Sequence, residues 1–121
     1  MKKLLFLLII CILILASCEK KESLVPKSEL PTWLKDIVDG YDLALQQNTN
    51  NPVLAGTVWI RYKWNNDYYF EHQSMISSSF DYPISYNRDT LKVCPVCTGT
   101  AYHDNKSSKQ YVWKGSIYAA D

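Results

Sequence analysis

The motif with the clearest chemical content in this sequence is the CxxC pair formed by Cys94 and Cys97. Two cysteines at this spacing can form a disulfide, act as a thiol-redox pair or supply two thiolates to a metal. A redox pair needs a thiol pKa lowered by a following helix N-terminus, and Thr98-Gly99-Thr100 is a poor helix former. A structural zinc takes four ligands, and with no second CxxC the set would need His72 and His103. A disulfide is the default if the chain is exported.

The two histidines are also the candidate general bases. Their possible partners are the carboxylates of Asp81 and Asp104 and the hydroxyls of residues 77–79. The sequence has no GxSxG, no HExxH and no phosphate-binding glycine loop. We therefore predict no catalytic residues, no cofactor and no metal, and an enzyme is not the favoured interpretation.

Aromatic residues are the third feature that indicates function. Of the 3 Phe, 4 Trp and 9 Tyr, all but Phe6 lie after residue 30. Such a density is typical of core and cross-strand pairs in a small sheet, or of a surface that stacks on sugars or on a partner protein. Trp59 alternates in phase with Arg61 and Lys63, opposite an apolar face, so we expect these three to form an exposed binding surface.

Two periodic segments must position these residues. From Pro31 to residue 45 the apolar residues recur at three- and four-residue steps, which predicts an amphipathic helix. Residues 57–64 alternate with a period of two, which predicts a strand whose apolar face carries Val58, Ile60, Tyr62 and Trp64. We expect the helix to face the sheet through Trp33, Ile37 and Val38 and to pack there on Ile60 and Tyr62.

The rest of the chain predicts short strands joined by polar turns. A turn at 65–67 leads to a return strand at 68–73, and further strands are expected at 80–86, 91–93 and 110–118. Turns or loops are expected at 87–89 and 104–109. The fold class is therefore α+β, with one N-terminal amphipathic helix packed on a small antiparallel β-meander, and residues 31–121 form a single domain.

The first eighteen residues predict the cellular location of this domain. Lys2 and Lys3 precede an apolar run that ends in Leu15-Ala16-Ser17-Cys18. The run is about a dozen residues long, too short for a span of roughly 20, and matches the three parts of an export signal. The four-residue end resembles the lipobox of bacterial lipoproteins. The resemblance implies a signal peptide at 1–17 and a lipid on Cys18, and Glu19 in place of Asp implies the outer membrane, on its periplasmic face or at the cell surface.

Residues 18–30 are charged and lack an apolar period, so we expect a flexible tether. Beyond the lipobox, three short motifs resemble small exported lipoproteins of unknown function, and this resemblance assigns no functional residue. These motifs are Leu30-Pro31-x-Trp33-Leu34, Arg61-Tyr62-x-Trp64 and Tyr68-Tyr69.

Charge and composition favour a binding role over nucleic-acid recognition. Removing Lys2 and Lys3 with the signal changes the formal net charge from +1 to −1, so no nucleic acid is expected as a partner. The predicted function is a lipid-anchored, non-enzymatic binding or interaction module of the cell envelope, whose partner is an envelope or extracellular protein or a glycan. The alternatives are a thiol-redox or metal protein that uses Cys94 and Cys97, and a small inhibitor of a secreted hydrolase.

Overall fold

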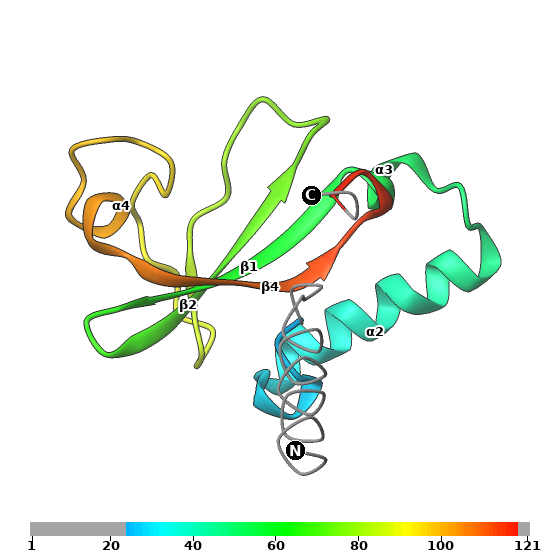
Figure 1. Cartoon of the computed structure of the whole chain (residues 1–121), viewed down its shortest axis with the longest axis horizontal. Coiled ribbons are helices and arrows are strands. Elements are labelled where there is room, and N and C mark those ends of the chain that lie inside the picture. The colour runs from blue at the N-terminus through cyan, green and yellow to red at the C-terminus, as the bar shows by residue number, and fades with distance from the viewer. Residues whose placement is uncertain (1–23, 119–121) are drawn as a thin grey trace, which may run out of the picture.

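The computed structural model describes residues 24–118, which combine helices with a four-stranded antiparallel sheet (Figure 1). The proposed signal segment and Cys18 lie outside the described residues. The strands are β1 (Thr57–Trp64), β2 (Asp67–Ser74), β3 (Ile84–Ser85) and β4 (Ser107–Lys114). The helices are α2 (Thr32–Gln47), α3 (Pro52–Ala55) and α4 (Ala101–Asn105), with short 3-10 turns η1 (Lys27–Glu29) and η2 (Ser116–Tyr118). The mixed helix-and-sheet class predicted from the sequence is confirmed.

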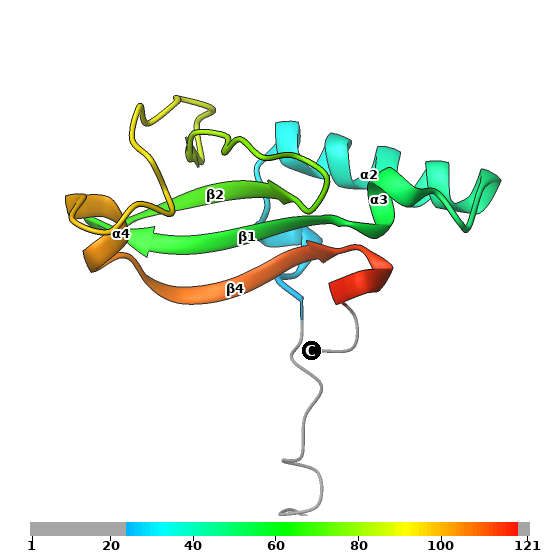
Figure 2. The same cartoon turned by 90° about the horizontal axis from the view of Figure 1, so that it is seen from above.

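The long helix α2 occupies the segment where the three- and four-residue period predicted it. The Pro31 carbonyl accepts hydrogen bonds from the amides of Leu34 and Lys35, which starts the helix without a side-chain cap. Leu34 and Val38 form its most buried stripe. The helix lies along one side of the sheet, while α4 lies at the far end of the strands from α3 (Figure 2).

Strands β1 and β2 form a hairpin whose turn chemistry is visible in the sequence. Asn65 and Asn66 have positive φ angles of 50° and 64°, which asparagine tolerates and a two-residue hairpin turn requires. The turn fixes the register in which Trp64 faces Asp67 and Arg61 faces Phe70.

The strand order β3-β2-β1-β4 is not the predicted meander, because the last strand returns to pair with β1. Three local predictions were also wrong. The strand expected at 80–86 is reduced to β3, residues 91–93 form no strand, and the expected loop at 104–109 contains the end of α4 and the start of β4. These segments are short, so few residues define their period.

The face of β1 that receives α2 is the opposite of the one predicted. Trp59 is only 5% exposed, and its ring lies 6.0 Å from that of Trp33 in an edge-to-face contact. Ile60 and Tyr62 therefore point away from the helix, although Ile60 is also buried. Because residues 57–61 of β1 are buried on both faces of the strand, alternation alone could not show which face α2 occupies.

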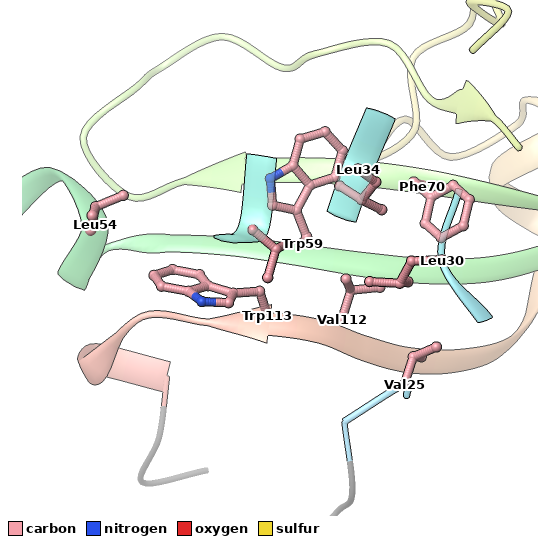
Figure 3. Close-up of a cluster of buried hydrophobic side chains, with 9 residues drawn as sticks. Val25, Leu30, Leu34, Leu54, Trp59, Phe70, Val112 and Trp113 are labelled. Atoms are coloured by element: carbon pink, nitrogen blue, oxygen red, sulfur yellow. The ribbon is translucent and has the colours of Figure 1, made fainter. Parts of the chain in front are cut away.

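A single hydrophobic cluster joins α2, the sheet and the chain that precedes the helix (Figure 3). Trp59, Phe70 and Trp113 supply its aromatic part. Ring contacts continue outward, where Tyr41 meets Trp113 with centroids 4.9 Å apart. The remaining buried members are Val25, Leu30, Leu34, Val38, Leu54 and Val112.

Residues 24–30 belong to the folded domain, which corrects the tether predicted for 18–30. Val25 and Leu30 are each 4% exposed, and the Val25 amide donates to the Tyr111 carbonyl at 2.8 Å. At the exposed surface, hydrogen bonds from the Lys27 ammonium to Asp39 and Asp42 raise the pKa of that lysine. Only Val25 and Leu30 are buried among residues 24–30, and two positions are too few to show a hydrophobic period.

Candidate functional site

The two cysteines singled out by the sequence form a disulfide, with their sulfur atoms 1.95 Å apart, as predicted. The Pro95 carbonyl between them accepts hydrogen bonds from Lys106 Nζ and from His103 Nδ1, each at 2.8 Å. His103 therefore donates from Nδ1 and holds the disulfide loop. No group of three or more metal-ligating side chains occurs within residues 24–118, so the structure does not assemble the Cys94, Cys97, His103 and His72 set.

Behind the disulfide loop lies a buried ion pair that the sequence did not predict. Glu71 is fully buried, and its Oε2 accepts from Lys106 Nζ at 2.9 Å and from the Tyr102 hydroxyl at 2.7 Å. The Lys106 ammonium also lies 4.1 Å from the centroid of the Tyr62 ring. The Glu71 Oε1 atom is buried and has no hydrogen-bond partner in the described part of the chain.

The surroundings of the buried ion pair raise the pKa values of two tyrosines. Burial, together with the nearby Glu71 carboxylate, raises the pKa of Tyr62 to about 12. Burial and the hydrogen bond to Glu71 also raise the pKa of Tyr102 well above its usual range. Both side chains are neutral phenols at neutral pH, and the cluster holds α4 and the disulfide loop against β2.

His72 and Asp81, a pair considered from the sequence, do meet. His72 Nδ1 lies 2.6 Å from Asp81 Oδ2, and the imidazole ring packs 5.1 Å from the Trp59 ring. The histidine lines a hollow of about 230 Å³ together with Ser74, Ser78 and Ser79. Within residues 24–118 no hydrogen bond joins His72 to a serine, so the nucleophile–base contact of a hydrolase is not formed.

Trp59, Arg61 and Lys63 do not form the exposed binding surface that the sequence predicted. Trp59 is in the core, and Arg61 is 3% exposed and donates from Nε and Nη2 to Gln110 Oε1 at 3.0 and 2.6 Å. The Arg61 guanidinium also lies 4.2 Å from the centroid of the Tyr68 ring. Only Lys63 is exposed, as expected for a surface residue.

A different aromatic site lies between the start of β2 and the turn after β3. It is a hollow of about 250 Å³, which we call the tyrosine groove. Tyr68 and Tyr86 stand at its rim, 38% and 46% exposed. The groove is lined by Asp67, Tyr68, Tyr69, Ser85, Tyr86, Asn87, Asp89, Thr90 and Leu91.

Contacts from behind hold the walls of the groove. The Tyr69 ring packs edge-to-face on Trp64 and on Tyr102, each at 5.7 Å. The backbone carbonyl of Tyr86 accepts a hydrogen bond from the Trp33 indole at 3.0 Å. Across the turn, the Ser85 amide donates to the Asp89 carbonyl at 2.8 Å. The groove is therefore formed before any ligand arrives.

Three polar side chains in the groove have no protein partner within residues 24–118 and are available to bind a ligand. Asp67, Asn87 and Asp89 are exposed, and none of these side chains makes a hydrogen bond or ion pair to another residue in the 24–118 range. They are free to bind a ligand. The sequence showed both halves of the site, the Tyr68-Tyr69 pair and the 87–89 turn, but not that the second hairpin brings them together.

Comparison of the chain with protein-family models, with curated proteins and with solved structures finds no match. Within residues 24–118, none of the helices combines the length and the apolar character that a membrane span requires. The function of this protein must therefore be inferred from the geometry of the site and from the N-terminal sequence.

Proposed function

We propose that this chain is a lipid-anchored protein of the bacterial cell envelope whose folded domain binds a ligand through the tyrosine groove. The observation that supports the binding role is the combination of exposed tyrosine rings with carboxylate and amide groups that have no partner among residues 24–118. Ligand sites are typically concave, with aromatic walls and a few polar groups that orient the ligand.

Binding is favoured over catalysis because several reactive groups serve the fold, and no serine is hydrogen-bonded to the His72–Asp81 pair within residues 24–118. The cysteines are joined to each other, and Glu71 and Lys106 neutralise one another below the surface. The groove itself offers acceptors and aromatic rings but no histidine, cysteine or lysine. A preformed site of this kind binds without spending free energy on ordering its walls.

The anchor half of the proposal rests on Leu15-Ala16-Ser17-Cys18, with Cys18 as the lipidated residue and Glu19 favouring the outer membrane. Because the domain already begins near Leu24, residues 18–23 can separate it from the lipid by at most about 20 Å, even when fully extended. The tyrosine groove would then face ligands close to the membrane surface, on whichever side of the outer membrane the protein is displayed.

Hydrogen exchange tests the binding role without knowledge of the ligand. The full chain, purified in detergent, would be compared with and without a soluble extract of bacterial envelope and medium components. We expect slower exchange in peptides that cover residues 67–69 and 84–91, and unchanged exchange along α2. No slowing at the groove, or slowing confined to other segments, would show that this groove is not the binding site.

A further inference from the structure

We propose that the tyrosine groove takes a neutral saccharide, with one sugar ring seated against the exposed Tyr86 ring and the free carboxylates. This inference rests on the proposed binding function and names the chemical class of its ligand. Four properties of the groove support a saccharide: its exposed aromatic ring, its unpartnered polar groups, its local charge and its size.

An exposed aromatic ring at the groove matches the apolar face of a sugar ring. Tyr69 is fixed by two edge-to-face contacts, and Tyr86 exposes nearly half of its surface. Tyrosine offers a broad, rigid surface with a polar edge and loses little conformational entropy on binding. Rings of this kind can stack on the C–H face of a pyranose while their hydroxyls meet its polar rim.

The polar groups match hydroxyls. Asp67 and Asp89 supply acceptors only, and the Asn87 amide supplies both acceptors and donors. A ligand rich in O–H groups can donate to both carboxylates and accept from the amide, so that no buried polar group is left without a partner. An apolar ligand would remove these groups from water without compensation.

The charges around the groove select a neutral ligand. The lining contains two carboxylates and neither lysine nor arginine, so an anionic sugar would be repelled. A cation gains little net attraction, because Arg61 and Lys63, which lie 4.2 Å and 6.0 Å from the centroid of the Tyr68 ring, offset the two carboxylates. A third positive charge near this ring would be repelled by both.

The size of the groove sets how much ligand it holds. Its volume of about 250 Å³ is below the roughly 300–1,000 Å³ typical of sites for drug-sized ligands. The groove therefore suits one ring, and the neighbouring residues of a longer glycan would lie outside it.

Direct binding of defined oligosaccharides tests the inference. The full chain would be held in a detergent without a sugar head group and titrated with neutral tetrasaccharides of glucose, galactose, mannose and N-acetylglucosamine. Tetragalacturonate and choline would serve as anionic and cationic probes. We expect at least one neutral probe to bind, and both charged probes to bind more weakly or not at all.

Two tyrosine variants locate the binding. Tyr86→Ala removes a ring of the groove but keeps the backbone carbonyl that accepts from Trp33, so it should fold normally and weaken binding about tenfold or more. Tyr82→Ala is the matched control, because Tyr82 is also 46% exposed but lines the neighbouring hollow beside His72. It should leave the affinity unchanged, and thermal melting would show that both variants are folded.

The inference is overturned if no neutral tetrasaccharide binds, if a charged probe binds more tightly, or if Tyr86→Ala and Tyr82→Ala behave alike. The proposed binding function fails separately, when the envelope extract leaves the exchange of residues 67–69 and 84–91 unchanged. Protection by the extract without binding of any neutral probe would retain a binding groove and reject the saccharide.

Discussion

At the scale of single residues, the buried pair of Glu71 and Lys106 is expected to have a large effect on stability. Their side chains are only 1% and 9% exposed, and removing one partner of such a pair leaves a buried charge without compensation. Lys106→Met should therefore lower the free energy of unfolding by about 3–5 kcal/mol, measured by urea denaturation.

Lys92→Met is the matched control for this change, because Lys92 is exposed and has no partner within residues 24–118. It should change stability by less than about 0.5 kcal/mol. Adding Glu71→Leu to Lys106→Met should restore part of the loss, because the orphaned carboxylate is then gone. A Lys106→Met protein as stable as the Lys92→Met protein would show that the pair does not support the fold.

The sequence predicted the positions of some of the candidate functional residues and not of others. Cys94 and Cys97 are close in sequence, so their bond could be inferred from spacing and export alone. The burial of Glu71 could not be inferred from the sequence, because its partner Lys106 lies 35 residues away. Trp59 was misplaced because an aromatic ring next to charged neighbours in a strand looks exposed, whereas here α2 covers it.

At the scale of elements, the segment before α2 acts as part of the core. Leu30 is 4% exposed and packs in the cluster with Leu34 and Val112. Leu30→Ala should cost about 2–5 kcal/mol of unfolding free energy, since it removes buried methyl groups and leaves a cavity. Denaturant unfolding of the full chain measures this loss.

Leu24→Ala is the control for the same segment, because Leu24 is 46% exposed. It should be close to neutral. If both variants kept the stability of the parent chain, residues 24–30 would be a tether after all, as the sequence alone had indicated.

The sequence predicted well those helices and strands in which the hydrophobic pattern repeats several times. The helix α2 and the strands β1 and β2 are long enough for their apolar positions to repeat several times. In contrast, β3 has two residues and α4 has five, so their existence depends on contacts with other segments. The Tyr102 hydroxyl bound to Glu71 is one such contact.

At the scale of the whole molecule, the order of the strands explains both the wrong prediction and the site. Because β4 pairs with β1, β3 is left as the edge strand of the sheet, beside β2. This edge strand brings the 85–89 turn beside Tyr68 and Tyr69 and creates the groove. Local patterns show which segments are strands, whereas the pairing of distant strands depends on the packing of the whole chain.

The central claim is that the molecule is exported and held at the membrane by a lipid on Cys18, so that its groove meets ligands of the envelope. Labelling cells that express the full chain with a radioactive or alkyne-bearing fatty acid tests it most directly. Cys11→Ala is the matched control, since Cys11 lies inside the proposed signal segment. We predict label on the parent chain and on Cys11→Ala, and none on Cys18→Ala, which should accumulate as the unprocessed precursor. Label retained on Cys18→Ala, or absent from the parent chain, would contradict the account.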